Sequence, residues 1–256
     1  VTVLQPYDQE ITAKQVKDAL RDDTILVSTM YVNNETGTIL PITEIGEVVR
    51  NHSAVYHVDA VQAVGKLTIK PEELGIDFLS ASGHKFHGPK GVGFLYASTM
   101  DFDSYIHGGD QEYKKRAGTE NLPAIVGMVA AIKEELSKQT ENYQTVQRLQ
   151  DLFLTKISSL NYYINHGKEQ LPYVLNLGFP GQKNDLLLLR MDLAGISIST
   201  GSACTAGIVQ TSHVLKAFYG NGSHRLHESV RISLSPQNTD EEIIQLVNTL
   251  KEIIGD

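Results

Sequence analysis

The sequence lacks the features that mark secreted, membrane-spanning and nucleic-acid-binding proteins. Its 256 residues include one cysteine, Cys204, so no internal disulfide can form. The longest apolar run, residues 124–132, is too short to span a bilayer, and residues 1–20 carry charges and do not resemble a signal peptide. No lysine-rich or arginine-rich run is present, and the formal net charge is -8, which argues against a nucleic-acid-binding surface. We therefore expect a soluble, cytoplasmic protein that contacts neither membrane nor nucleic acid directly.

The first half of the chain alternates apolar runs with helical patterns. Apolar residues make up 41% of the sequence, enough to bury a core. A helix is predicted after a capping box at residues 12–15, and another after Thr43 as its cap. Runs typical of buried strands occupy residues 1–4, 24–30, 54–58, 76–81 and 92–96. The alternation predicts an α/β fold, with a three-layer large domain built on a mainly parallel sheet. The run at 24–30 predicts a strand buried on both faces.

The second half has a different pattern, which predicts a second domain. Pro123 can open a helix over residues 124–136, and residues 137–160 form a polar helical segment. Beyond them, strand-like runs alternate with helices, and the last helix begins with a capping box of Thr239 and Glu242. These strands are predicted at 173–177 and 230–234, and the helices at 184–194 and 239–254. We therefore expect a large domain at residues 1–137 and a smaller α+β domain at residues 138–256.

Polar residues follow three predicted strands where each strand ends. In open α/β sheets, ligands bind outside the carboxyl ends of the strands. Any one cluster could be a simple turn or a helix cap. Their occurrence at successive strand ends favours a common ligand site. The clusters are Asn33, Asn34 and Glu35; Asp59 and Gln62; and Ser82, His84 and Lys85.

Lys85 lies in the stretch SASGHKFHGPKGVGF, a glycine-rich loop between two predicted strands. A partly desolvated lysine can form a Schiff base or transfer protons. A nearby aspartate suits a pyridinium nitrogen, and hydroxyls, a histidine and backbone amides suit a phosphate. Together these are the groups that pyridoxal phosphate requires. A zinc site at His84 and His87 is a weaker alternative, because no cysteine or carboxylate stands nearby at ligand spacing.

Five motifs occur in a fixed order along the chain. They are HVDAVQ at 57–62, SGHK at 82–85, RAGTEN at 116–121, STGSACT at 199–205 and VRISL at 230–234. The set resembles the fold-type I pyridoxal-phosphate enzymes of the class V aminotransferase group. Within that group it is similar to the cysteine desulfurases of the housekeeping and nitrogen-fixation type. The resemblance covers essentially the whole chain.

The resemblance implies roles around pyridoxal 5'-phosphate. Lys85 would bond covalently to the cofactor and then move protons between the cofactor and the substrate α-carbon. Asp59 would pair with the pyridinium nitrogen. Gln62 would donate a hydrogen bond to the phenolic oxygen, and Asn34 would lie near that oxygen and the substrate.

Further roles concern the phosphate, the substrate and a second subunit. Ser82 and His84 would bind the phosphate. Thr119 resembles the family residue that reaches the phosphate of the other subunit, which implies a homodimer. Arg231 would bind the substrate carboxylate through two parallel hydrogen bonds.

Cys204 would be the nucleophile of the reaction. Glycines at 201 and 207 and hydroxyls at 200, 202 and 205 surround it, a poor setting for a buried structural cysteine. The resemblance implies that L-cysteine becomes L-alanine while Cys204 takes the sulfur as a persulfide on a short mobile loop. The sulfur would pass to an iron–sulfur scaffold or a tRNA-thiolation enzyme. No metal site is built in, although Cys204 could serve as a transient iron–sulfur ligand.

The sequence departs from the family in one large respect. Family members carry a further segment before the position of Val1, with a phosphate-binding loop and a histidine that stacks on the cofactor ring. The large domain is therefore expected to be incomplete at its N-terminus, with exposed apolar surface and an unpaired sheet edge. Two alternatives stay open. One is another class V enzyme, such as a selenocysteine lyase, and the other is an inactive fragment that folds or binds a partner without the cofactor.

Overall fold

The computed structural model describes residues 1–201 and 211–255, which divide into two compact units. One unit consists of Ala13–Tyr31 and Pro41–Gln139, and we call it the parallel-sheet unit. The other consists of Val1–Thr12, Val32–Leu40 and Thr140–Asp256, and we call it the antiparallel-sheet unit. Two short early segments thus belong with the C-terminal part of the chain. The predicted domains, residues 1–137 and 138–256, stay a prediction.

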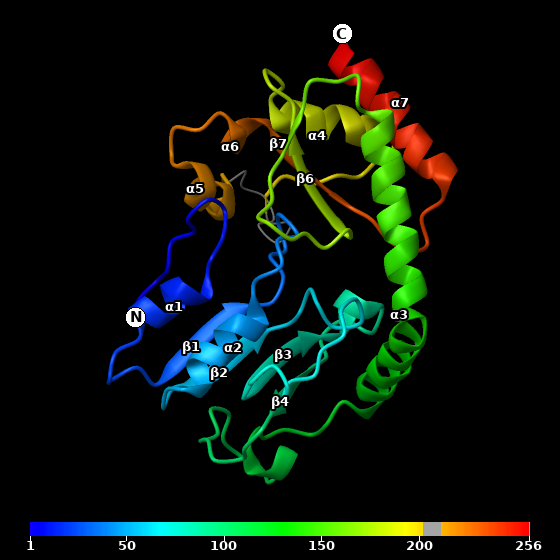
Figure 1. Ribbon diagram of the computed structural model, residues 1–256. Helices are drawn as coiled ribbons and strands as arrows, with labels where there is room; N and C mark the ends of the chain where they lie inside the picture. Colours follow the sequence, from blue (N-terminus) through cyan, green and yellow to red (C-terminus); the bar gives the residue numbers. More distant parts are fainter. Residues whose placement is uncertain (202–210, 256) are drawn as a thin grey trace. The chain divides into compact units, whose positions relative to one another are not determined.

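The parallel-sheet unit is built on four strands in the order β1-β2-β3-β4 (Figure 1). β1, β2 and β3 run parallel, and β4 is antiparallel to β3. The strands are β1 (Leu26–Met30), β2 (Val55–Asp59), β3 (Phe78–Ser82) and β4 (Gly93–Ala97). The short helix η1 (Gly83–Phe86) joins β3 to β4, and η2 (Glu112–Lys114) follows β4. The predicted α/β fold with a mainly parallel sheet is confirmed.

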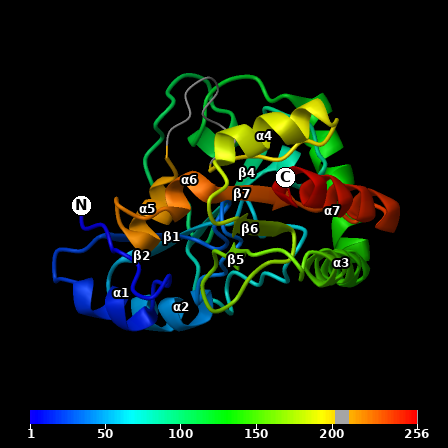
Figure 2. The ribbon, with the colours of Figure 1, turned by 90° about the horizontal axis from the view of Figure 1, so that it is seen from above.

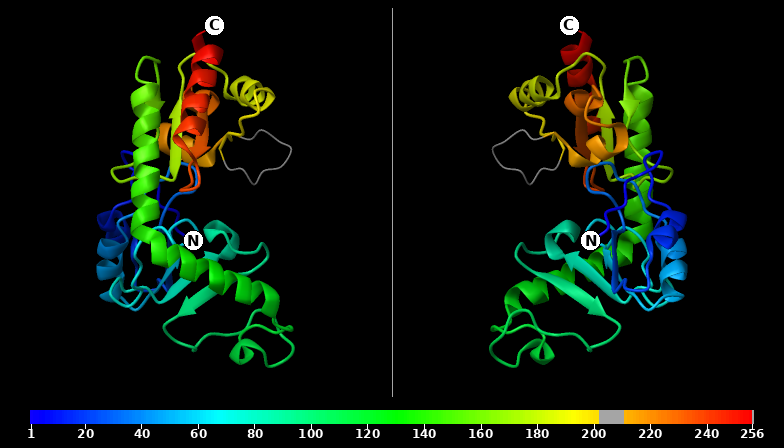
Figure 3. Two further views of the ribbon diagram at one scale, coloured as in Figure 1. Left: turned by 90° about the vertical axis from the view of Figure 1, so that its right-hand side faces the viewer. Right: turned by 90° about the vertical axis from the view of Figure 1, so that its left-hand side faces the viewer.

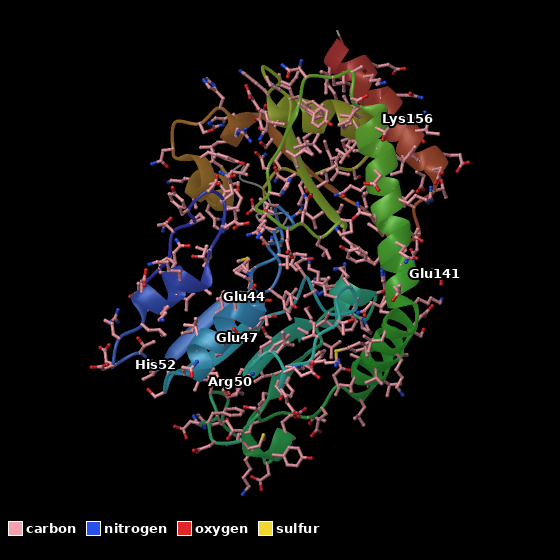
Figure 4. All side chains as sticks on the ribbon, in the orientation of Figure 1. Glu44, Glu47, Arg50, His52, Glu141 and Lys156 are labelled. Atoms are coloured by element: carbon pink, nitrogen blue, oxygen red, sulfur yellow. The ribbon has the colours of Figure 1, made fainter. Side chains whose placement is uncertain are left out.

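Helices α1 (Ala13–Ala19) and α2 (Ile42–Arg50) lie side by side in this unit (Figures 1 and 2). α2 is amphipathic, since Ile42, Ile45 and Val49 are buried while Glu44 and Glu47 are exposed (Figure 4). The sheet buries a matching row that includes Tyr56, Val58 and Leu79. Each such side chain contributes about 1.5–3 kcal/mol when it leaves water. Apolar periodicity in the sequence therefore accounts for this layer.

Three sequence predictions about the first fifty residues are wrong. Residues 1–4 form no strand and are mostly exposed, because no described strand pairs with them. β1 is not buried on both faces, since exposed and partly covered residues alternate along it and Leu26 is 53% exposed. It lies at the edge of the sheet, so only its inward side chains are covered. Thr43 does not cap α2, which begins one residue earlier and has Pro41 at the cap position.

The antiparallel-sheet unit contains three strands in the order β5-β6-β7. They are β5 (Tyr163–Ile164), β6 (Val174–Gly178) and β7 (Ser229–Ser233). Its helices include α4 (Asn184–Leu193), α5 (His213–Tyr219), α6 (Arg225–Glu228) and α7 (Asp240–Gly255). α7 lies between α4 and the C-terminal part of the long helix α3 (Leu122–Lys156) (Figures 2 and 3). The predicted capping box of α7 is confirmed, because the Thr239 and Glu242 side chains each bond the other residue's backbone N–H.

Helix α3 (Leu122–Lys156) is one continuous element of 35 residues, where the sequence predicted two helical segments. Pro123 lies in its first turn, where the missing N–H costs no helical hydrogen bond. The later half buries Val146, Leu149 and Phe153 in the core of the antiparallel-sheet unit. Among the helices that the structure describes, α3 included, none is both long and apolar enough to cross a lipid bilayer.

Candidate active site

The parallel-sheet unit brings several predicted site residues to the side of its sheet where β2 and β3 end. Asp59 is the last residue of β2, and Ser82 is the last residue of β3. β2 and β3 are parallel neighbours with Asp59 opposite Ser80, so both strands end at the same edge. The structure thus places these two residues where the strand-end rule predicted a ligand site.

Lys85 lies in η1, directly after β3, and is held there by a tight loop. A Cβ on Gly93 would lie 2.4 Å from the Ala81 carbonyl oxygen, so β4 can pair this closely only with glycine at that position. A Cβ on Gly88 would lie 2.9 Å from the Gly83 carbonyl oxygen, which imposes the same requirement. The loop therefore folds back on itself and leaves Lys85 half-buried.

The side chains around Lys85 carry hydrogen-bonding groups of several kinds. The Ser82 Oγ and the His84 Nδ1 lie 2.8 Å apart, and His84 is exposed. The Asp59 Oδ1 accepts a hydrogen bond of 3.0 Å from the Val61 N–H, and this carboxylate is also exposed. A hydroxyl, an imidazole, a carboxylate and an amine thus occur together at this edge.

Lys66 is a charged residue near this site that the sequence analysis missed. It is half-buried, and its Nζ donates to the Gln62 carbonyl oxygen at 3.4 Å. Burial lowers the pKa of Lys66 to about 8, with a further lowering from the positive charge of Lys85 and an opposing effect of Glu135. The neighbouring Gly65 packs against Phe86, because a Cβ on it would lie 3.3 Å from the Phe86 Cβ. In the sequence, the one indication of the contact between Lys66 and Gln62 was their four-residue spacing.

A polar row crosses the face of the sheet that carries Asp59. The His57 Nδ1 lies 2.8 Å from the Ser28 Oγ, and its Nε2 lies 3.2 Å from the Ser80 Oγ. His57 belongs to the HVDAVQ motif, but nothing in the motif indicates that both ring nitrogens have partners. Three adjacent strands are thereby joined through one imidazole.

The antiparallel-sheet unit brings together two other predicted residues, Asn34 and Arg231. The Arg231 Nη1 donates to the Asn34 backbone oxygen at 3.0 Å. The backbone of Arg231 also pairs with Ser199, through hydrogen bonds of 3.0 and 2.6 Å. Cys204, the predicted nucleophile, lies outside the described residues.

Thr119 and the histidine pair were also singled out from the sequence. Thr119 is exposed in the loop before α3, and no hydrogen bond joins its side chain to another predicted site residue in the described part of the chain. His84 pairs with Ser82, whereas the His87 Nε2 lies 3.7 Å from the Glu135 Oε1. The two histidines thus have different partners. Within residues 1–201 and 211–255, no three His, Cys, Asp or Glu side chains gather in a way that could hold a metal ion.

Comparisons with known proteins show what the chain is similar to. Residues 1–246 match the model of the family described as aminotransferase class V. A Bacillus subtilis (strain 168) protein with the provisional name cysteine desulfurase IscS 1 is 48% identical over 248 residues, 95% of this chain and 65% of that protein. The structure of a NifS-like protein from Rickettsia africae ESF-5 is 30% identical, with a TM-score of 0.88 over 98% of this chain and 69% of that one. A structure of SspA in complex with cysteine is 35% identical, with a TM-score of 0.78 over 93% of this chain and 67% of that one. The chain spans less than two thirds of the length of the Bacillus relative.

Proposed function

Because the chain belongs to the class V aminotransferase family, we propose that the protein is a pyridoxal-phosphate-dependent cysteine desulfurase. It converts L-cysteine to L-alanine and takes the sulfur onto Cys204 as a persulfide. The observation that carries this proposal is the position of Lys85, half-buried in η1 beside the strand ends that bear Asp59 and Ser82. The similarity to proteins named as cysteine desulfurases supports the same reaction.

The donor set of the parallel-sheet unit fits pyridoxal 5'-phosphate. Lys85 offers an amine to the aldehyde, and the exposed Asp59 carboxylate has an oxygen to share with the ring nitrogen. Ser82 and His84 offer a hydroxyl and an imidazole to the phosphate. Gln62 follows Asp59 on the same turn and is assigned to the phenolic oxygen.

Each residue then has a defined task. Lys85 would hold the cofactor through its aldehyde group and would move the proton at the substrate α-carbon. Asp59 would favour a proton on the ring nitrogen by its negative charge. Asn34 would lie near the phenolic oxygen and the substrate. When bound, the cofactor supplies an electron-accepting ring that stabilises negative charge at the substrate α-carbon.

Arg231 and Cys204 complete the reaction. The Arg231 guanidinium binds the substrate carboxylate, and its bond to the Asn34 backbone oxygen fixes the position of its side chain. The Cys204 thiolate attacks the substrate sulfur, a sulfur–sulfur bond forms and the carbon–sulfur bond breaks. The bonding electrons stay on the substrate β-carbon, which takes up a proton. L-cysteine and the thiol therefore give L-alanine and a persulfide, with no other reactant.

The protein's partners are part of the same proposal. Thr119 is exposed, as a residue that contacts the phosphate of a second subunit must be before assembly, and we assign it that role in a homodimer. The persulfide passes to an acceptor protein in the cytoplasm, such as an iron–sulfur scaffold or a tRNA-thiolation enzyme. A selenocysteine lyase is less well supported, because the polar sequence around Cys204 suits a sulfur-accepting thiol.

The first test is covalent capture of the cofactor. The chain is mixed with pyridoxal phosphate, excess cofactor is removed, and the product is reduced with borohydride and mapped by mass spectrometry. We expect a yellow absorbance band and a label on Lys85. Lys85→Ala should lose the label, whereas Lys90→Ala, an exposed lysine on the same loop, should keep it. A label on any other lysine, or no band at all, would contradict the assigned cofactor site.

The second test separates sulfur transfer from cofactor attachment. Because Cys204 is the sole cysteine, a persulfide on the chain can be located without ambiguity. We expect Cys204→Ser to abolish persulfide formation from L-cysteine while the borohydride label on Lys85 is retained. Persulfide sulfur recovered from the serine variant would refute the assignment of Cys204. Persulfide on the wild type without alanine would refute the proposed reaction.

A further inference from the structure

Glu35 is a fully buried carboxylate that the proposed reaction does not use. It is 0% exposed. Its Oε2 accepts a hydrogen bond from the Ser212 Oγ, while no hydrogen bond joins its Oε1 to another residue in the described part of the chain. The Nδ1 of His213, an exposed side chain, lies 3.7 Å from Oε1. A buried carboxylate with so few partners lowers stability relative to an apolar or amide side chain, so stability alone does not account for it.

The backbone on both sides of this carboxylate is fixed. The Glu35 N–H donates to the Asn33 Oδ1 at 2.9 Å, in a turn closed by the Gly37 N–H bond to the Asn33 carbonyl oxygen. The Asn176 Nδ2, from β6, donates to the Glu35 carbonyl oxygen at 3.1 Å. The carboxylate therefore projects from a rigid turn that is anchored to the central strand of the antiparallel sheet.

The Glu35 carboxylate is hydrogen-bonded to the chain after the segment that contains Cys204 and lies near the chain before it. On the downstream side, the Ser212 hydroxyl donates to Glu35 and accepts from the Leu215 N–H at 3.0 Å, which caps α5. On the upstream side, a Cβ on Gly201 would lie 3.7 Å from the Glu35 Oε2 and 3.6 Å from the Ser212 Cβ. One side chain thus lies against the two described residues between which residue 204 falls in the sequence.

We infer that Glu35 is a positioning residue. Its carboxylate holds Ser212 beside Gly201 and so fixes these two residues, which stand on either side of Cys204 in the sequence. This inference rests on the proposed function, in which Cys204 takes the sulfur. Glu35 touches neither substrate nor cofactor in this role and acts through Ser212. Its removal therefore affects sulfur capture and leaves the proton transfer by Lys85 unchanged.

The test compares two reactions of the full chain loaded with pyridoxal phosphate. One is persulfide formation on Cys204 from L-cysteine, and the other is exchange of the L-alanine α-proton with deuterated solvent, which needs Lys85 but no thiol. We expect Glu35→Ala and Ser212→Ala to slow persulfide formation about tenfold, a size typical of lost positioning, with α-proton exchange unchanged. Ser212→Thr, which keeps the hydroxyl, should restore the rate.

The control is Thr36→Val, at a fully buried residue in the same turn whose hydroxyl bonds Asn33 and Thr38 and not Ser212. It should leave both rates unchanged. Glu35→Gln keeps an acceptor for Ser212 and should lose less than Glu35→Ala, and it also serves if the alanine variant does not fold. Equal slowing of both reactions, or slowing in Thr36→Val of the same size, would assign Glu35 a structural role only and overturn the inference.

Two measurements without cofactor separate this inference from the proposed function. The first is the rate of iodoacetamide alkylation, which reports on Cys204 alone because it is the sole cysteine. The second is hydrogen exchange of the Leu215 amide, which the Ser212 cap protects. Both rates should change about tenfold in Glu35→Ala and Ser212→Ala and stay constant in Thr36→Val. If the wild type formed no persulfide, the proposed function would fail while these rates still tested the positioning. Unchanged rates in both variants would refute it.

Discussion

Lys66→Met should make the protein more stable at neutral pH, although it removes a charged group. The fold holds the Lys66 ammonium half-buried and near the positive charge of Lys85, and together these effects lower the pKa of Lys66 from 10.5 to about 8. Met keeps the length of the aliphatic stem without the charge. The substitution therefore relieves desolvation and repulsion and leaves most of the packing in place.

The size of the effect follows from the two pKa values. A lowering from 10.5 to about 8 corresponds to about 3 kcal/mol of unfavourable interaction with the charged form. Solvent screens part of this at a half-buried position, so we expect a gain of about 2 kcal/mol in the free energy of unfolding at pH 7. Between pH 8 and pH 10.5 the unfolded chain binds more protons at this lysine than the folded chain. The stability of the wild type therefore rises with pH across that window, and its deficit relative to Lys66→Met should disappear.

Urea denaturation at pH 7, 9 and about 10.5 measures both effects. The control is Lys70→Met, since Lys70 is exposed and pairs with Glu73 at the surface, at 2.9 Å. That variant should stay within about 0.5 kcal/mol of the wild type at every pH. If Lys66→Met were less stable than the wild type at pH 7, or if the difference did not shrink with rising pH, the described burial of Lys66 beside Lys85 would be wrong.

Two further predictions concern packing and capping. Gly46→Ala should lower the free energy of unfolding by about 3 kcal/mol in a urea titration, although alanine is normally better in a helix, because the added Cβ would lie 1.9 Å from the Leu74 carbonyl oxygen. Gly222→Ala, in open space, is its control, and equal stability of the two variants would contradict the close contact. Thr239→Ala should cost about 1 kcal/mol by the same assay, since the Thr239 Oγ1 accepts from the Glu242 N–H. A cost near zero would mean that the capping box does not hold α7 in solution.

The parts of the fold that the sequence predicted are those set by local interactions. The capping box at Thr239 and Glu242 needs only neighbouring residues, and its two hydrogen bonds form as predicted. β2 and β3 follow from short apolar runs between turn residues. The exposure of β1 could not be predicted in the same way. An apolar run is equally compatible with a central strand and an edge strand, and Leu26 is exposed because of where the strand lies in the sheet.

The candidate site shows the same difference between what local sequence patterns predict and what packing decides. Asp59, Ser82 and Lys85 were found from the sequence because parallel strands end at one edge, and the structure places them there. Their chemical roles stay predictions. Glu35 stands in one of the strand-end polar clusters and Lys66 follows Gln62 by four residues, but neither pattern indicates how deeply a side chain is buried. Their burial is set by packing between segments that are distant in the sequence.

The half-buried Lys66 and the fully buried Glu35 are informative because each opposes the stability of its own unit. Lys66 is held near Lys85, and Glu35 is held against Ser212, with no hydrogen bond to its second oxygen from the described residues. The apolar periodicity of α2 and α7, by contrast, agrees with the residues that each helix buries. Disagreement between local rules and the fold is expected where function requires a particular charge at a particular place. Lys66 and Glu35 both adjoin residues on which the proposed chemistry depends. Burial and hydrogen bonding thus add Lys66 and Glu35 to the residues that the motifs mark for substitution.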